Sequence, residues 1–254
     1  MKFIIILIII LLFITRFYNK ENFKNSNNIK VIYINLEKDK DRNKKIIKLL
    51  KENNINYKRK NAIYGKNLNI NNLNNKIIDK TGLEDIKNKN YKYGLSLTMG
   101  GIGCAISHYE VIKNISEQDN ENIYIILEDD VNFKEKENLI SNIQTVLKNA
   151  PNNWDIIYIG YGPISDEYKN KKINENFYET NRIHGTFGYI VNKKGARKIL
   201  NIFPIKYQID TSLYLASRNK KINSYIYKPQ LIFHYDYSTT NIQVNPNTLQ
   251  DENI

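Results

Sequence analysis

Residues 123–130 read IYIILEDD, an uninterrupted apolar run that ends directly in three acids. A short continuous apolar run is typical of a strand that is buried on both faces, as the strands of a parallel sheet are. Open α/β sheets bind ligands outside the carboxyl ends of their strands. The run therefore predicts a central strand whose carboxyl end, at Glu128, Asp129 and Asp130, lies at a ligand-binding edge.

Strand-like and helix-like segments alternate on both sides of this run. Short apolar runs predict strands, and apolar residues at spacings of three and four predict helices. The predicted strands cover 31–34, 55–63, 155–159, 186–191 and 222–227. The predicted helices contain 46–50, 102–112, 139–147 and 196–203, with one more after 210, and 65–92 is expected to be a long connection. This alternation predicts the α/β class, with a mostly parallel sheet and helices on both faces.

The N-terminus carries an apolar run over residues 3–14. The run is shorter than the roughly 20 residues that span a bilayer, and no small-residue cleavage site follows it. We therefore expect a signal-anchor or signal sequence over 1–16, preferring the uncleaved anchor, and a polar stem over 17–28. The folded body is expected over 29–254, tethered to a membrane in an orientation that the flanking charges do not set.

Composition narrows the class of protein. The chain has 254 residues, 41% of them hydrophobic, which excludes a compositionally disordered protein. The net charge of +12 and the 19 tyrosines leave a basic polyanion-binding protein as one alternative. The basic residues form no single stripe, so nucleic acid is not the expected partner. A single cysteine, Cys104, excludes an intramolecular disulfide.

The three acids are the first candidates for chemistry. Adjacent carboxylates repel one another, and a divalent cation with oxygen ligands would relieve the repulsion and could hold a diphosphate. Helix capping in a solvated loop is the alternative. Asn35 and Arg42 follow the first predicted strand, a position that suits nucleotide contact, although a cap and a surface charge would fit as well.

Five strings occur in order along the chain: VIYINLEKDKDR (31–42), LTMGGIGCAISHYEVIK (97–113), IILEDDV (125–131), WDIIYIG (154–160) and GYIVNKKGARKIL (188–200). Together they resemble glycosyltransferase family 25, which includes collagen β-galactosyltransferases and bacterial lipooligosaccharide galactosyltransferases. The closing KPQLIFHY (228–235) is similar to the collagen-type members in particular. The resemblance implies one catalytic domain of the GT-A type, a Rossmann-like fold, after the N-terminal anchor.

The resemblance also implies site residues. Asp130, with Glu128 and Asp129 around it, stands at the family's DxD-like metal motif, and His234 stands where a further metal or diphosphate contact is common. The expected contacts to the nucleotide-sugar come from Asn35, Arg42, Ser107, His108, Glu128 and Asp129. One departure concerns the family's Gly-Glu-Ile-Gly-Cys, where this chain has Gly101 in place of the acid.

The reaction implied is an inverting transfer of a hexose from a UDP-sugar, with Mn²⁺ or another divalent cation. Galactose is the expected sugar and glucose the next, with a hydroxyl on collagen-like hydroxylysine or on a glycan as acceptor. We assign the general base to Asp210, for which an N-cap is the alternative, with Asp155 as runner-up. The lumen of the secretory pathway is the expected compartment if the source is eukaryotic or viral. A catalytically impaired, membrane-tethered interaction module and a retaining GT-A enzyme are further alternatives.

Overall fold

The computed structural model describes residues 28–88, 95–134, 139–162, 170–180 and 182–235. The expected anchor over 1–16, and the expected stem except its last residue, lie outside this part of the chain. Within it, no helix has the length and the apolar character needed to cross a membrane. The expected anchor, stem and domain boundaries therefore stay predictions.

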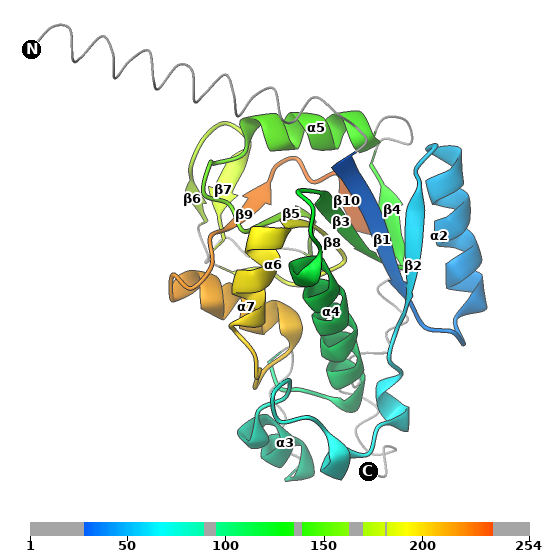
Figure 1. Ribbon diagram of the computed structural model, residues 1–254, viewed down its shortest axis with the longest axis vertical. Coiled ribbons are helices and arrows are strands. Elements are labelled where there is room, and N and C mark those ends of the chain that lie inside the picture. Colours follow the sequence, from blue (N-terminus) through cyan, green and yellow to red (C-terminus); the bar gives the residue numbers. More distant parts are fainter. Residues whose placement is uncertain (1–27, 89–94, 135–138, 163–169, 181, 236–254) are drawn as a thin grey trace, which may run out of the picture.

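The described elements alternate between strands and helices for most of the chain (Figure 1). The strands are β1 (Ile29–Asn35), β2 (Tyr57–Asn61), β3 (Ile123–Glu128), β4 (Val131–Phe133), β5 (Ile156–Gly160), β6 (Lys171–Lys172), β7 (Phe177–Glu179), β8 (Gly188–Asn192), β9 (Ser224–Tyr227) and β10 (Ile232–His234). The helices are α2 (Lys40–Glu52), α3 (Lys80–Lys87), α4 (Met99–Glu117), α5 (Leu139–Asn149), α6 (Lys193–Leu200) and α7 (Ile209–Arg218), with short 3-10 turns η2 (Gly65–Asn67) and η3 (Ile70–Asn72).

One mixed sheet runs through the described residues, in the order β2-β1-β3-β8-β5-β9-β7-β6. β2, β1 and β3 are parallel, as are β5, β9 and β10, while β8 lies antiparallel between β3 and β5. Since β3 and β5 are both antiparallel to β8, all six parallel-paired strands point the same way. The predicted α/β class and mostly parallel central sheet are confirmed. The exceptions are β8, inserted between β3 and β5, and the short strands β4 and β7, which lie antiparallel to β10 and β9.

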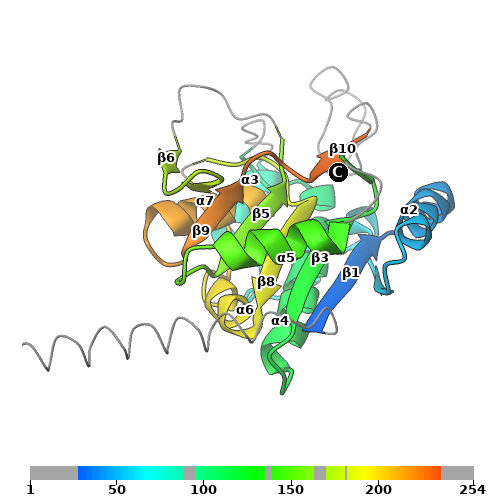
Figure 2. The ribbon, with the colours of Figure 1, turned by 90° about the horizontal axis from the view of Figure 1, so that it is seen from above.

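Both faces of the sheet are covered by helices, as predicted. Residues of β1 and β3 alternate between two apolar cores, because successive side chains of a strand point to opposite faces. Ile32 and Ile126 belong to the core beneath α3, α4, α6 and α7. Tyr33 and Leu127 belong to the core beneath α2 and α5. Figure 2 shows α5 lying across one face, with α4 and α6 on the other.

Two expectations about the local structure differ from what is observed. The segment expected to be one long connection over 65–92 contains η2, η3 and α3. The Asp79 side chain begins α3 by accepting a hydrogen bond of 2.8 Å from the Thr81 N–H, a cap that apolar periodicity does not reveal. The short strands β4, β6 and β7 were not predicted, because two or three residues are too few for a periodic pattern. The apolar residues 231–233 are strand-like in sequence, and β10 forms there.

The packing of α6 against the start of β5 depends on a glycine. A Cβ at Gly195 would lie 1.9 Å from the backbone oxygen of Asp155, so the helix backbone rests directly on the strand. The Asn192 side chain caps the helix by accepting a hydrogen bond of 2.7 Å from the Gly195 N–H. Any side chain at residue 195 must separate α6 from β5.

We expect Gly195→Ala to lower the free energy of unfolding by about 2–3 kcal/mol, because the methyl group overpacks this contact. Lys194→Ala, one residue earlier at an exposed position, is the matched control and should change it by less than about 0.5 kcal/mol. Urea denaturation measures both. Equal midpoints for the two variants would show that the contact can relax.

Candidate functional site

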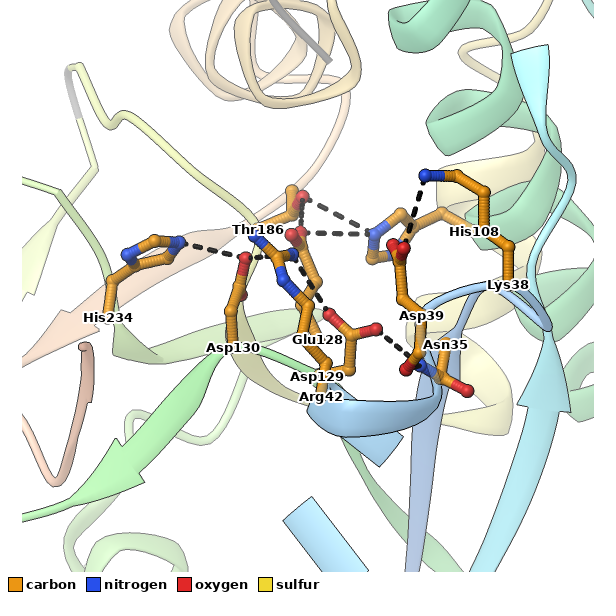
Figure 3. A network of polar contacts seen from close by, with 10 residues as sticks. All are labelled: Asn35, Lys38, Asp39, Arg42, His108, Glu128, Asp129, Asp130, Thr186 and His234. Atoms are coloured by element: carbon orange, nitrogen blue, oxygen red, sulfur yellow. Dashed lines mark hydrogen bonds and ion pairs between the residues drawn. The ribbon is translucent and has the colours of Figure 1, made fainter. Parts of the chain in front are cut away.

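The three acids at the end of β3 gather polar side chains from several elements (Figure 3). β1 and β3 are parallel, with Ile34 opposite Glu128, so Asn35 at the end of β1 lies beside the acids. Arg42 comes from the first turn of α2, and His234 from the end of β10. The predicted ligand-binding edge therefore collects side chains from four elements in three distant parts of the sequence, since β1 and α2 are neighbours along the chain.

Asp130 is almost fully buried, at 6% exposure. Its Oδ2 accepts a hydrogen bond of 2.8 Å from Arg42 Nη1 and lies 2.9 Å from His234 Nε2. Its Oδ1 is buried and, among the described residues, has no hydrogen-bond partner. A buried carboxylate oxygen that lacks a donor is costly unless a ligand or ion completes it.

Asp129 points toward β1. Its Oδ2 accepts a hydrogen bond of 2.6 Å from Asn35 Nδ2, and its Oδ1 lies 3.3 Å from Arg42 Nη1. Burial raises the pKa of Asp129 to about 6, and the neighbouring charges of Asp130 and Glu128 add to this, while Asn35 and Arg42 act in the opposite direction. The repulsion expected within the triplet is thus reflected in a carboxyl group that binds its proton more tightly.

Glu128 points away from the other two acids, toward α4 and the start of β8. Its Oε1 accepts a hydrogen bond of 2.8 Å from Thr186 Oγ1 and lies 3.4 Å from His108 Nε2. Burial alone would raise the pKa of Glu128, but the contacts to His108 and Thr186 outweigh it and lower the pKa. The other ring nitrogen of His108, Nδ1, is 2.9 Å from Tyr189 Oη.

His234 closes the site on the side opposite to Asn35. Burial alone would lower its pKa, but the hydrogen bond and the charge of Asp130 prevail and raise it. Its ring lies edge-on to the Phe187 ring, with the centroids 5.7 Å apart. A raised pKa favours the imidazolium, which pairs with Asp130 and would have to release its proton before the ring could bind a cation.

Asp210 lies in the first turn of α7, where its carboxylate accepts hydrogen bonds from the N–H groups of Gly185 (2.8 Å) and Thr211 (2.7 Å). Burial raises its pKa, although these hydrogen bonds and the charge of His184 act against the rise. The alternative role as an N-cap is not observed, because the N-cap of α7 is Gln208 and Asp210 lies two residues further on.

The residues 184–187 connect Asp210 to the acidic triplet. Gly185, at φ +80°, donates its N–H to Asp210, and the next residue, Thr186, donates to Glu128. The backbone N–H of Glu128 in turn donates to the carbonyl oxygen of Phe187 at 3.1 Å. Sequence reasoning missed Thr186, because a threonine at the start of a strand carries no signal of what it contacts.

The structure does not bring two of the predicted site residues into this cluster. Asp155 precedes β5, at the amino edge of the sheet, where its Oδ2 accepts from Lys198 Nζ at 2.7 Å and from the Asn223 N–H at 2.8 Å. Ser107 donates to the carbonyl oxygen of Gly103 and accepts from the Ile63 N–H. Asp155 thus lies at the opposite edge from Asp130, and Ser107 joins α4 to the segment after β2.

Gly101, which stands where the resemblance to the family leads one to expect an acid, packs closely against Gln208. A Cβ at this position would lie 2.3 Å from Oε1 of Gln208, whose carboxamide occupies the space beside the helix. Gln208 is buried and donates a hydrogen bond of 2.9 Å to the carbonyl oxygen of Ser96. An acid at residue 101 would therefore require Gln208 to move.

The raised pKa of Asp129 predicts how the stability of the protein, kept free of metal by a chelator, depends on pH. Since the folded-state pKa is about 6 and the unfolded value about 4, the folded state binds more protons in between, and stability falls as pH rises through that window. Asp129→Asn removes this loss and should stabilise the protein by about 1–2 kcal/mol at pH 7.5. Urea denaturation at pH 7.5 and pH 4 measures it, and a gain that persists undiminished at pH 4 would contradict this explanation.

Comparison with known proteins places the chain in a family. The model of glycosyltransferase family 25 (LPS biosynthesis protein) matches residues 28–213. Procollagen galactosyltransferase 1-B of Xenopus laevis is 32% identical over 181 residues, covering 69% of this chain and 28% of that protein. Procollagen galactosyltransferase 2 of Homo sapiens is 29% identical over 178 residues, covering 68% and 28%.

A viral relative is also similar. The procollagen lysyl hydroxylase and glycosyltransferase of Acanthamoeba polyphaga mimivirus is 26% identical over 159 residues, covering 55% of this chain and 17% of that protein. The chain spans less than a third of the length of each of these three relatives. The family match extends from β1 into α7 and includes Asn35, Arg42, the acidic triplet and Asp210. The chain belongs to glycosyltransferase family 25.

Proposed function

We propose that this glycosyltransferase moves a hexose from a UDP-sugar to an acceptor hydroxyl in one displacement that inverts the anomeric centre. The observation that carries the proposal is the buried Oδ1 of Asp130, which has no hydrogen-bond partner in the part of the chain that the structure describes. It lies between Asn35, Arg42 and His234 at the carboxyl edge of the sheet. Galactose is the proposed sugar and glucose the next, in line with the galactosyltransferase relatives.

A GT-A type of domain over 29–254 is part of the proposal. The parallel unit β2-β1-β3, with polar residues after β1 and β3, has the form of a nucleotide-binding half of an open α/β sheet. The antiparallel β8 then joins this unit to β5, β9 and α7, which carries Asp210. Donor and acceptor would meet where the two parts of the sheet share an edge.

The donor set of the triplet fits a hard divalent cation such as Mn²⁺. Carboxylate oxygens from Asp130 and Asp129 and a ring nitrogen from His234 are the proposed ligands. Such a cation would stabilise the negative charge that develops on the departing diphosphate. Because Arg42 now bonds both aspartates, its guanidinium would become available to a phosphate once they turned to a cation.

Asp210 is the proposed general base. Its raised pKa moves it closer to neutrality than an exposed aspartate, which favours proton transfer from a hydroxyl. The N–H groups of Gly185 and Thr211 fix the carboxylate, so that its orientation does not depend on the substrate. Asp155 remains the less favoured alternative, because an ion pair with Lys198 and a backbone N–H already hold it.

The proposed acceptor is a hydroxyl on a protein, such as hydroxylysine in a collagen-like chain, or on a glycan. The relatives act on procollagen by their names, which supports the first. Membrane tethering through residues 1–16 and residence in the secretory lumen belong to the same proposal. One observation favours a second candidate, a catalytically impaired interaction module: the Gln208 carboxamide fills the space beside Gly101.

We expect Asp130→Asn to lower the rate of UDP-galactose turnover in Mn²⁺ by at least about 100-fold, because the group that completes the cation site is lost. Asp41→Asn in α2, whose side chain is exposed, is the matched control and should keep the rate. The measurement is release of UDP with and without acceptor. Full turnover by Asp130→Asn, or by the wild type in excess chelator, would rule out the metal assignment.

Asp210→Asn should lower kcat for transfer by about 10²–10⁴-fold and leave the KM for the donor nearly unchanged, because a general base acts on the acceptor proton. The acid limb of the wild-type pH–rate profile should lie above the ordinary aspartate range and disappear in the variant. For comparison, Asp155→Asn should lose stability while its folded fraction keeps kcat. A full kcat in Asp210→Asn would remove the residue from the chemistry.

A further inference from the structure

A second group of metal-ligand atoms lies next to the triplet. The Cys104 thiol, a ring nitrogen of His108 and a carboxylate oxygen of Glu128 all lie within 4.8 Å of one another. We propose that these three residues bind a single cation of the zinc type through one sulfur, one nitrogen and one oxygen. This site shares no ligand with the proposed Asp130 site, and the proposal does not rest on the function above.

The fold itself brings the three ligands together. Cys104 and His108 are four residues apart on α4, so their side chains share one face of the helix. That face meets the carboxyl end of β3, where Glu128 turns away from Asp129 and lies 3.4 Å from His108 Nε2. Two ligands at i and i+4 on one face of a helix can bind the same zinc ion, and here a neighbouring strand would supply the third.

Two of the ligands already have supporting contacts. His108 is 2% exposed, and its Nδ1 lies 2.9 Å from Tyr189 Oη, which leaves Nε2 directed at Glu128. Glu128 Oε1 accepts from Thr186 Oγ1 at 2.8 Å. Hydrogen bonds of this kind regularly orient the histidines and carboxylates that bind metals. In a histidine the bond is made by the other ring nitrogen, and in a carboxylate it can be accepted by a lone pair that does not face the metal.

The chemistry of the three groups differs from that of the Asp130 site. A thiolate and an imidazole favour zinc-type ions, whereas the carboxylates of Asp129 and Asp130 favour Mn²⁺ or Mg²⁺. Burial raises the pKa of the Cys104 thiol well above its ordinary range, so the cation must displace the thiol proton. A bound divalent ion would be neutralised by the thiolate and the Glu128 carboxylate, which removes the cost of burying it.

The geometry requires only a small contraction. Ligand atoms of tetrahedral zinc lie roughly 3.5 Å apart, as bond lengths of about 2.0–2.3 Å dictate. A separation of up to 4.8 Å therefore has to close by about 1 Å, within the range of rotamer adjustments. Three protein ligands leave a fourth position for water. A bound cation would hold the part of α4 between Cys104 and His108 against Glu128, the last residue of β3.

The test uses the whole chain, stripped of metal by a chelator, and Co²⁺ as the probe. Because Cys104 is the single cysteine, a sulfur-to-cobalt charge-transfer band in the near ultraviolet reports directly on its ligation. We expect this band to saturate at one equivalent of Co²⁺, together with visible bands of tetrahedral intensity, and to vanish when Zn²⁺ is added. Asp130→Asn should keep the band although it loses turnover, so failure here and failure of the proposed function are distinguishable.

Variants then assign the ligands. Cys104→Ser should abolish the charge-transfer band, and Glu128→Gln should weaken Co²⁺ binding at least tenfold. Zn²⁺ should raise the Tm of the wild type but not of Cys104→Ser, with circular dichroism confirming that each variant is folded. Absence of the band in the wild type, where no substitution can have disturbed the fold, overturns the proposal. An equal Zn²⁺ effect on Tm in the wild type and Cys104→Ser overturns it as well.

Discussion

Three carboxylates in succession at the end of a buried strand impose the constraint on which this structure depends. None of them can remain charged in an apolar surrounding without a donor, a cation or a proton. The partners are Asn35 on β1, Arg42 on α2, His234 on β10 and Thr186 in the segment before β8. Together β1, α2, β10 and the segment before β8 therefore supply the hydrogen bonds and positive charges that compensate for burying the three acids.

The pleat of the strand gives neighbouring acids different surroundings. Glu128 points to α4 and Thr186, and its pKa is lowered, while Asp129 points to Asn35, and burial raises its pKa to about 6. Asp130, beyond the strand, has one oxygen that finds no hydrogen-bond partner among the residues the structure describes. Identical chemical groups that are held in unlike environments can take unlike roles, which is how one short acidic run can serve two neighbouring cation sites of different chemistry.

Much of this could be predicted from the sequence, for physical reasons. Continuous apolar runs revealed β1, β3 and β5, and the alternation of strands with helices indicated a mostly parallel sheet. The direct pairing of β1 with β3, which places Asn35 beside the acids, is seen only in the structure. The antiparallel direction of β8 could not be predicted, because an apolar run has no direction. The pairing of β10 with β4 that carries His234 to Asp130 was hidden for another reason: three-residue strands form only through contacts with distant parts of the chain.

The contacts of Thr186 and Gln208 show why the proposed acceptor side, at Asp210, was harder to anticipate than the proposed donor side. The donor side lies on strand ends, whose positions follow from local pattern, whereas Asp210 depends on a turn at Gly185 with positive φ. That turn links Asp210 to Glu128, because Gly185 donates to the first acid and the adjacent Thr186 to the second. Gln208 packs against Gly101 just before Asp210, and this brings the start of α4 into the same unit. The proposed base, the acidic triplet and the helix that carries Cys104 and His108 are thus positioned together, and a side chain at residue 101 would meet Gln208 two residues before Asp210.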